Sequence, residues 1–270
     1  IAVPSNVAAY TSHTPVIITG DGAFTPENGV TSGSGTQLDP YVIEGWDFES
    51  GYAGIQVVTT SAHFVIRDIY THNNGVGIVL RNVTNGTVLS SEVYLNWFGW
   101  DYWGIVIDDC TMVNIFDNNI SIHDRGIYVR SSTLCNISGN NLSMDNYGIC
   151  LEDSTNCVMS GNTITQSYIS AVQLDHCEDN TVHENSITDL DSGQAVVLQN
   201  ANGVMVSKNY MSHAVSAFSV VGCHDVHILD NVLERSEASG AYVTGSHDVI
   251  IQNNTLSEVF SAVEVLASEN

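Results

Sequence analysis

Two histidine–aspartate pairs recur with a fixed spacing near the end of the chain. His224-Asp225 and His247-Asp248 begin 23 residues apart, and His227 follows closely after the first pair. Imidazole nitrogens and carboxylate oxygens together form a ligand set for divalent transition metals. The alternative is that these are polar, exposed turn residues that a repeat places in corresponding positions. No resident cofactor is expected, and a surface-bound divalent cation at these four positions is the one metal site that the sequence suggests.

Aromatic side chains gather in one segment of the chain. Three of the four tryptophans lie between residues 94 and 103, and this segment is five residues longer than its counterpart in the following repeat. An insertion of this length cannot lie wholly in a filled core, so part of it is expected to be an exposed interaction surface. It would contact another protein, stack on sugar rings, or fold back onto the molecule. The candidate contact residues are Trp97, Phe98, Trp100, Tyr102 and Trp103.

Cleavage of a polysaccharide near these aromatic residues would need a pair of carboxylic acids. Asp101, Asp108 and Asp109 are the candidates. However, Asp108, Arg130 and Glu152 follow one another at intervals of 22 residues, which favours an acid–base–acid ladder of surface ion pairs. The spacing reveals no second convergent acid. The main prediction is therefore that the protein is not an enzyme.

An asparagine that returns about every 22 residues indicates the elements that must position these side chains. An aliphatic residue follows each asparagine by two positions, and a small residue precedes a short strand pattern such as Gly126-Ile127-Tyr128-Val129. The unit is too short for two helices, whereas one coil of parallel β-strands fits its length. Amides stacked on neighbouring coils can hydrogen-bond to one another and to turn backbone. The ladder comprises Asn118, Asn140, Asn162, Asn185, Asn209, Asn231 and Asn254.

The repeat predicts an all-β chain with two parts. Residues 41–270 are expected to form a parallel β-helix of about ten coils, and residues 1–40 an N-terminal cap that covers the open edge of the first coil. No polar capping segment follows the last strand pattern, so identical chains are expected to join head to tail there. The candidate residues of this joint are Val263, Val265 and Leu266.

Charge and composition restrict the partners and the compartment. Thirty acidic and six basic residues give a net charge of −24, which excludes nucleic acid and anionic membrane surfaces as partners. No apolar run is long enough for membrane insertion. The first residues resemble the start of a mature secreted protein. Six sequons predict glycosylation at Asn82, Asn85, Asn119, Asn136, Asn141 and Asn253.

The six cysteines do not have the spacing of a zinc site. Cys135 and Cys157, 22 residues apart, fall in one inward column of adjacent coils. They would form either a disulfide or a pair of buried thiols that pack as small apolar groups. Cys150 lies between Ile149 and Leu151, so alternation predicts that it points outward, where it would be available for a bond between subunits.

Three N-terminal stretches and the repeats themselves resemble a known family. The stretches are His13–Ile18, Gly22–Thr36 and Asp39–Trp46, and the repeats have the forms Gly-Ile-X-Leu and Ser-Gly-Asn-X-Ile. They are similar to secreted archaeal right-handed parallel β-helix proteins, which are grouped with the NosD-like, copper-associated periplasmic repeats. The resemblance covers nearly the whole chain and implies a right-handed parallel β-helix of the cell-surface or sheath type. No Met/His/Cys cluster of copper type accompanies it.

These observations lead to one main functional prediction and two alternatives. The main prediction is a secreted structural glycoprotein that self-assembles into a cell-surface layer (S-layer), sheath or filament, with itself as the partner. The first alternative is a carbohydrate-binding or polysaccharide-cleaving β-helix protein whose partners are surface glycans. The second is a metal-binding surface protein.

Overall fold

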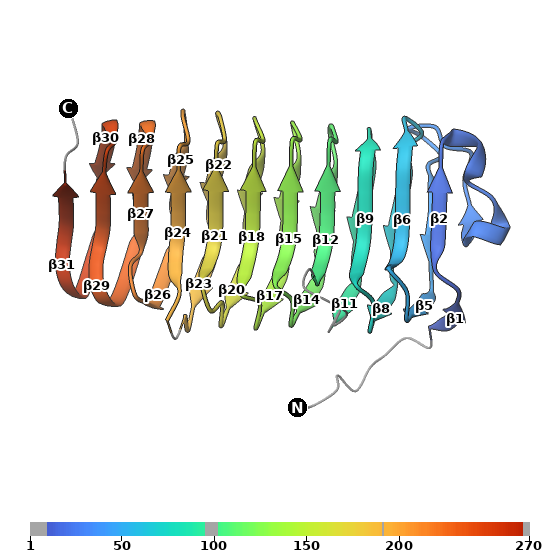
Figure 1. Ribbon diagram of the computed structural model, residues 1–270, viewed down its shortest axis with the longest axis horizontal. Coiled ribbons are helices and arrows are strands. Elements are labelled where there is room, and N and C mark those ends of the chain that lie inside the picture. The colour runs from blue at the N-terminus through green and yellow to red at the C-terminus, as the bar shows by residue number, and fades with distance from the viewer. Residues whose placement is uncertain (1–9, 95–101, 191, 267–270) are drawn as a thin grey trace.

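The computed structural model describes residues 10–94, 102–190 and 192–266, which form one elongated stack of β-strands (Figure 1). The strands belong to a 20-stranded sheet and an 11-stranded sheet, and equivalent strands of successive repeats pair in parallel. The one antiparallel pairing between strands joins β3 to β4 near the N-terminal end of the described chain. This arrangement is the parallel β-helix that the 22-residue period predicts.

Three columns of strands run along the stack. The first column, labelled along the middle of Figure 1, consists of β2 (Val16–Thr19), β6 (Ala53–Thr60), β9 (Val76–Val83), β12 (Trp103–Asp108), β15 (Arg125–Arg130), β18 (Tyr147–Glu152), β21 (Ser170–Asp175), β24 (Gln194–Gln199), β27 (Phe218–Val221) and the second halves of β29 (Val232–Thr244) and β31 (Thr255–Leu266). The second column consists of β1 (Thr11–His13), β5 (Trp46–Glu49), β8 (Tyr70–His72), β11 (Glu92–Tyr94), β14 (Asn119–Ser121), β17 (Asn141–Ser143), β20 (Thr163–Thr165), β23 (Ser186–Thr188), β26 (Tyr210–Ala214) and the first halves of β29 and β31. The third column, which is the 11-stranded sheet, consists of β3 (Val30–Ser32), β4 (Tyr41–Glu44), β7 (Phe64–Arg67), β10 (Gly86–Leu89), β13 (Asn114–Phe116), β16 (Asn136–Ser138), β19 (Val158–Ser160), β22 (Thr181–His183), β25 (Met205–Ser207), β28 (His224–Leu229) and β30 (His247–Gln252).

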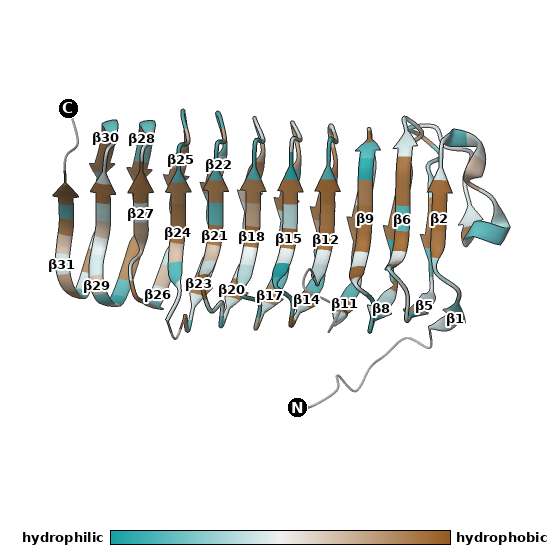
Figure 2. Ribbon diagram, in the orientation of Figure 1, coloured by the Kyte–Doolittle hydropathy of each residue, from teal (hydrophilic) through white to brown (hydrophobic). Residues whose placement is uncertain are grey.

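The core is a set of aliphatic columns inside the stack, because alternate residues of each strand point inward. Ile105, Ile127 and Ile149 are in register on successive strands of the first column, and all three are fully buried. The first-column strands are correspondingly hydrophobic in Figure 2. A glycine near the start of some of these strands allows the close approach of neighbouring coils. A Cβ added at Gly148 would lie 2.5 Å from the carbonyl oxygen of Ala171 on the next coil.

The parallel stacking begins before residue 41, where the sequence pattern places the boundary of the cap. Strands β1 and β2 pair in parallel with β5 and β6, so residues 11–19 already contribute to the stack. The rest of the segment holds two short 3-10 helices, η1 (Asp21–Ala23) and η2 (Pro26–Asn28). Phe24, between them, stacks on Tyr41 at a ring-centroid distance of 4.6 Å, and so packs this segment against the helix.

A ladder of buried asparagines joins the coils. From Asn118 to Asn231, each side-chain Nδ2 donates to the Oδ1 of the next asparagine at 2.9–3.0 Å. The same Oδ1 accepts the backbone N–H of the preceding asparagine at 2.9–3.1 Å. Each Nδ2 also donates to a backbone carbonyl on the coil before it, as Asn140 does to Ile115. Every amide therefore satisfies turn backbone that would otherwise be buried without a partner.

Replacing one member of this ladder is expected to destabilise the whole stack. Asn162→Ala removes the oxygen that accepts both the backbone N–H and the side-chain Nδ2 of Asn140. It also removes the two hydrogen bonds that the fully buried Asn162 Nδ2 donates. We expect a loss of about 3 kcal/mol in the free energy of unfolding, measured by urea denaturation. The matched control is Asn141→Ala, which removes one exposed hydrogen bond and should cost less than about 1 kcal/mol. Equal losses in the two variants would contradict a stabilising role for the ladder.

A buried acid should give the protein an unusual dependence of stability on pH. Asp145 and His123 are both inaccessible, and burial raises the pKa of Asp145 to about 6 although the hydrogen bond and charge of His123 oppose this. The folded state then retains this proton to a higher pH than the unfolded state does, so stability falls between about pH 4 and pH 6. Relative to wild type, Asp145→Asn should be more stable at pH 7 than at pH 4, by up to about 3 kcal/mol. Urea unfolding of both proteins at the two pH values measures this difference. A difference that does not change with pH would refute it.

Among the residues that the structure describes, no helix has the length and apolar character that a membrane crossing requires.

Candidate functional site

The outer face of the first column carries a second apolar cluster instead of a polar surface. Val79, Val106, Tyr128 and Cys150 point away from the core, yet each is less than 7% exposed. They follow one another in register along β9, β12, β15 and β18. Trp103 and Tyr147, from the starts of β12 and β18, pack against the same cluster. This part of the outer face is therefore covered by large side chains.

Cys150 corrects one prediction made from alternation. It does point away from the core, but it is buried among the outer-face side chains rather than exposed. Burial raises the pKa of its thiol to about 12, and a protonated, inaccessible thiol is not a reactive one. It is therefore not available for the bond between subunits that the sequence suggested.

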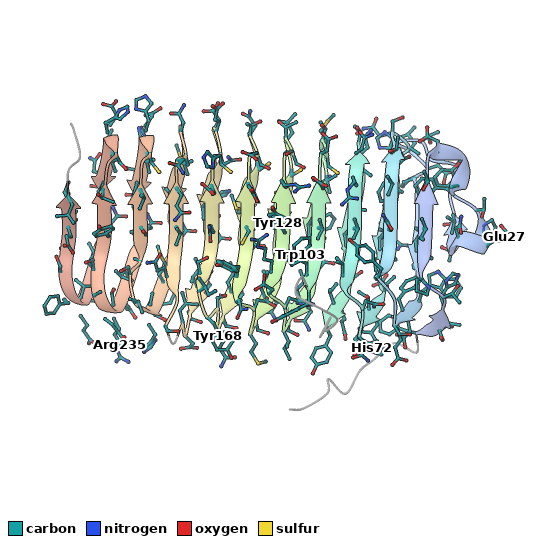
Figure 3. The ribbon with its side chains drawn as sticks, in the orientation of Figure 1. Glu27, His72, Trp103, Tyr128, Tyr168 and Arg235 are labelled. Carbon is teal, nitrogen blue, oxygen red and sulfur yellow. The ribbon has the colours of Figure 1, made fainter. Side chains whose placement is uncertain are left out.

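A polar pocket of about 230 Å³ adjoins this cluster on β15, β18 and β21. It is lined by Arg125, Tyr128, Tyr147, Cys150, Leu151, Glu152, Gln173 and Asp175. The lining follows from the stacking, because parallel strands bring equivalent residues of adjacent coils side by side. Tyr128, Cys150 and Gln173 are register partners. In Figure 3 the labelled Trp103 and Tyr128 mark this region of the stack.

Arg125 lies at the centre of three aromatic rings. Its guanidinium carbon is 4.4 Å from the ring centroid of Tyr128 and 5.8 Å from those of Trp103 and Tyr147. The rings of Trp103 and Tyr128 are themselves 5.3 Å apart. The Nε of Arg125 is buried and has no hydrogen-bond partner within the described ranges of the chain. The site therefore presents aromatic surface around a cation that has donor capacity to spare.

Two acidic residues line the pocket from adjacent coils. Glu152 and Asp175 are register partners on β18 and β21, so their backbones are about 4.8 Å apart. The Tyr128 hydroxyl donates to Glu152. Burial, followed by the bond to Glu152, raises the pKa of Tyr128 to about 12. Asp175 contacts His176 Nδ1 at 2.9 Å and accepts a hydrogen bond from Asn200 at 3.3 Å.

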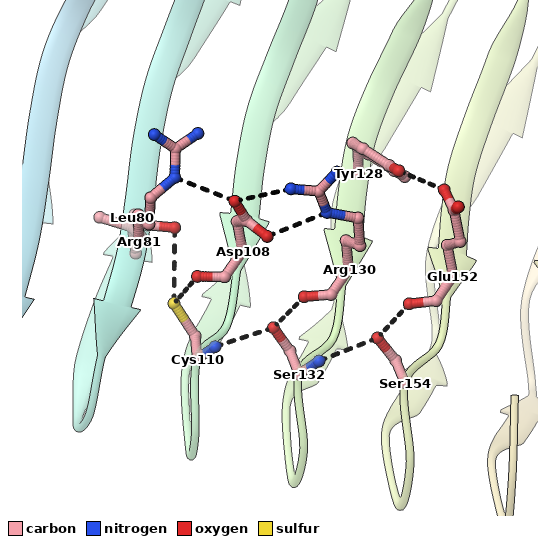
Figure 4. A network of polar contacts seen from close by, with 9 residues as sticks. All are labelled: Leu80, Arg81, Asp108, Cys110, Tyr128, Arg130, Ser132, Glu152 and Ser154. Atoms are coloured by element: carbon pink, nitrogen blue, oxygen red, sulfur yellow. Dashed lines mark hydrogen bonds and ion pairs between the residues drawn. The ribbon is translucent and has the colours of Figure 1, made fainter.

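Asp108 is held by two arginines and is not free to transfer protons (Figure 4). Its carboxylate contacts Arg81 Nε at 2.9 Å and both Nε and a terminal nitrogen of Arg130 at 3.0 Å. Burial raises its pKa, but the hydrogen bonds and charges of Arg130 and Arg81 outweigh this and hold the pKa below its usual value. The expected ladder is thus present between Asp108 and Arg130, while Glu152 binds Tyr128 instead.

The remaining sequence candidates fall into three groups. Trp97, Phe98, Trp100 and Asp101 lie outside the described residues. Tyr102 is half-buried beside Trp103, whereas Asp109 is an exposed turn residue with φ of 55°. The six sequon asparagines are exposed or half-buried, and their glycosylation stays a prediction.

His224, His247 and Asp248 converge on the outside of the stack. They are all exposed, and their ligand atoms lie within 4.8 Å of one another. Asp225, the fourth candidate, pairs with His227 instead, at 3.3 Å.

All six cysteines are buried free thiols. Cys135 and Cys157 contact each other through their thiols, and this contact together with burial raises the pKa of Cys135. The second of the two interpretations offered for this pair, stacked thiols without a disulfide, describes the structure.

The sequence reasoning missed Arg125, Tyr128, Tyr147, Gln173 and Asp175. Their signal was the same register that identified the core, because positions one coil apart stack. Arg125 stacks on Tyr147, Tyr128 and Gln173 flank Cys150 in one column, and Glu152 stacks on Asp175.

The buried thiols lead to a direct chemical test. At about pH 8, none of the six cysteines of the native protein should react rapidly with an aromatic disulfide reagent, and all six should react after unfolding in urea. Absorbance of the released thiolate counts them. Rapid modification that is lost in Cys150→Ala would show that this side chain is exposed.

Comparisons with known proteins identify the fold family. The model of the family described as periplasmic copper-binding protein (NosD) matches residues 15–191. The model of the right handed beta helix region matches residues 125–270. These matches confirm the predicted right-handed parallel β-helix and the resemblance to NosD-like proteins. No curated protein matches the chain.

Several solved structures share the fold at low sequence identity. A C387A mutant of DFA-IIIase from Arthrobacter chlorophenolicus A6, in complex with DFA-III, has a TM-score of 0.64 and 11% identity over 80% of this chain and 61% of its own. The GH136 lacto-N-biosidase from Eubacterium ramulus has a TM-score of 0.63 and 13% identity over 83% and 49%. The enzymatically active domain of tailspike protein 2 from bacteriophage CBA120 has a TM-score of 0.65 and 8% identity over 82% and 42%. This chain spans less than two thirds of the length of each.

These structures overturn the main functional prediction. The chain was expected to be a non-catalytic structural protein that self-assembles, whereas the similar folds are those of enzymes and of an enzymatically active domain. The expectation rested on the exposed last strand, where Val263, Val265 and Leu266 are 43–58% exposed. An open terminal strand is a property of any β-helix end, so it does not identify a like molecule as its partner.

Proposed function

This chain belongs to the NosD family of right-handed β-helix proteins, and from that premise we propose that it is a carbohydrate-active enzyme. The proposed active site is the pocket on the outer face of β15, β18 and β21. The observation that carries the proposal is the juxtaposition of two carboxylates, Glu152 and Asp175, with an arginine and tyrosine rings in one pocket. The carbohydrate-acting enzymes that share this fold support it.

The two acids fit the requirements of glycoside hydrolysis. Retaining glycosidases use a pair of carboxyl groups about 5–5.5 Å apart, one as nucleophile and one as proton donor. Glu152 and Asp175 line one pocket from register-paired positions, where the backbones of adjacent strands are about 4.8 Å apart, so both side chains can reach a sugar bound there. The Tyr128 hydroxyl donates to Glu152 and so fixes the orientation of that carboxylate, which we assign as the nucleophile. Asp175 would protonate the leaving oxygen as Glu152 attacks the anomeric carbon and the glycosidic bond breaks. Asp175 would then take a proton from the water that releases the sugar from Glu152.

The rest of the pocket would bind the sugar chain. Tyr147, in the lining of the pocket, would offer ring surface for the apolar face of a sugar, and Trp103 in the adjoining apolar cluster would extend that surface. Gln173 and Arg125 offer donors to its hydroxyl groups. The net charge of −24 would repel a polyanionic chain, so the substrate we propose is a neutral glycan. A periplasmic or secreted location is part of this proposal, because the family is described as periplasmic.

Copper, which the family description names, does not fit the matched segment. Within the described part of residues 15–191, no group of three His, Cys, Asp or Glu ligands comes within metal-binding distance. The cysteines there are buried, Glu152 accepts the hydrogen bond of Tyr128, and, among the residues described, Asp175 has only one histidine, His176, beside it. No step of the proposed reaction therefore involves a metal.

Release of reducing ends from a panel of neutral oligosaccharides tests the proposed function. Glu152→Gln and Asp175→Asn should each lower kcat by at least about 100-fold, because each removes a group that acts in the transition state. Binding of the substrate should persist in both variants, as measured by calorimetry. Tyr147→Ala should instead raise KM, because it removes stacking surface.

The matched control is Asp153→Asn. Asp153 is an exposed acid that directly follows Glu152 but lies outside the pocket. Its substitution should leave kcat and KM unchanged. Folded protein that neither binds nor cleaves any member of the panel would refute the proposed function, and full activity in Glu152→Gln would refute the assignment of the site.

A further inference from the structure

Two histidines stack on adjacent coils at the C-terminal end of the third column. His224 and His247 are register partners, and they open β28 and β30, the last strands of the 11-stranded sheet (Figure 1). Their ring centroids are 4.1 Å apart. The same backbone column holds Glu178 and Asn202 on the two preceding coils, so imidazoles replace other polar side chains only here.

Asp248 completes a three-ligand cluster with these rings. Its Oδ2 lies 3.2 Å from Nδ1 of His224 and 3.2 Å from Nδ1 of His247. The backbone of Asp248 is left-handed, with φ of 56°, directly after His247 at the start of β30. Asp225 has the equivalent backbone, with φ of 50°, but its carboxylate pairs with His227. One carboxylate oxygen is therefore shared by two imidazoles on different coils.

We propose that His224, His247 and Asp248 bind a divalent transition metal ion. Bonds of about 2.1 Å in a tetrahedral site place ligand atoms about 3.4 Å apart, close to the two 3.2 Å separations in the structure. Two nitrogens and one oxygen favour Cu²⁺ or Zn²⁺ over Ca²⁺ and Mg²⁺, which take oxygen ligands. By the general order of affinities, Cu²⁺ binds more tightly than Zn²⁺.

The surroundings of the cluster favour a cation with an open coordination position. The side chains of the three ligands are 46–57% exposed, which leaves room for water or an external ligand as the fourth ligand. The net charge of −24 raises the local concentration of cations. In the part of the chain that the structure describes, this is the single group of three such ligands.

This site is separate from the proposed carbohydrate pocket and from the family match. The pocket lies on β15, β18 and β21, in the middle of the stack, whereas β28 and β30 lie near its C-terminal end (Figure 1). The segment that matches the NosD family ends at residue 191, before the first ligand. Metal binding here is thus a property of the C-terminal coils of this chain.

Titration of the purified protein with CuCl₂ and with ZnCl₂, each in a millimolar excess of Mg²⁺, tests the proposal. The Mg²⁺ occupies the many surface carboxylates, so calorimetry should report one equivalent of bound transition metal. Electron paramagnetic resonance of the Cu²⁺ form should show coupling to two equivalent nitrogens. His224→Ala, His247→Ala and Asp248→Asn should each weaken binding at least about 10-fold.

His227→Ala is the matched control, because this histidine is three residues from a ligand but pairs with Asp225. It should bind metal as wild type does, and circular dichroism should show all four variants folded. Glu152→Gln should also bind metal normally, because Glu152 belongs to the separate carbohydrate pocket. The metal-binding result therefore does not depend on whether the protein cleaves a glycan. Absence of stoichiometric binding in excess Mg²⁺, or equal affinity in His227→Ala and His247→Ala, would overturn the proposal.

Discussion

The fold depends on the register between successive coils, and the buried asparagine ladder is the interaction that best specifies it. Each Oδ1 accepts one backbone and one side-chain N–H from the coil before it, in turns from which water is excluded. A shift of one residue would leave these donors and acceptors buried without partners, at a cost of about 1–3 kcal/mol for each group. A shift of one residue would also turn the inward aliphatic side chains outward, whereas apolar contacts alone have no preferred direction. The amides therefore supply the directional part of the stacking energy.

Fixed register has a consequence for the surface as well as for the core. Every outward position becomes a column, and the chemistry of a column is set by which residues occupy it on neighbouring coils. Asp108 between Arg81 and Arg130 is one outcome, a satisfied ion-pair network. Glu152 beside Asp175 is another, in which two acids are neighbours without an intervening base. The same architecture thus yields an ion pair or a pair of adjacent acids depending on single residues within the repeat.

The period of the sequence was sufficient to predict the parallel strands, the inward aliphatic columns and the stacked amides, because these depend only on spacing. Features that depend on side-chain reach were not predictable in the same way. Alternation correctly turns Cys150 outward, but it cannot show that Tyr147 and Arg125 surround that position. Spacing aligns Glu152 with Arg130, yet the Tyr128 hydroxyl is the partner of Glu152. The start of the stack at β1 was hidden for a related reason, since residues 11–19 pair in parallel without showing the repeat.

In the histidine cluster, the repeat places the candidate ligands close together, and neighbouring side chains determine which of them converge. The 23-residue interval is enough to stack His224 on His247, because both occupy one column. It makes Asp225 and Asp248 equivalent too, and on spacing alone both would be ligands. They differ because His227 engages the first carboxylate, whereas Asp248 is followed by apolar residues and turns to the two rings. Position in the repeat therefore brings the groups within reach, and the residues two or three places further along each strand decide which of them converge.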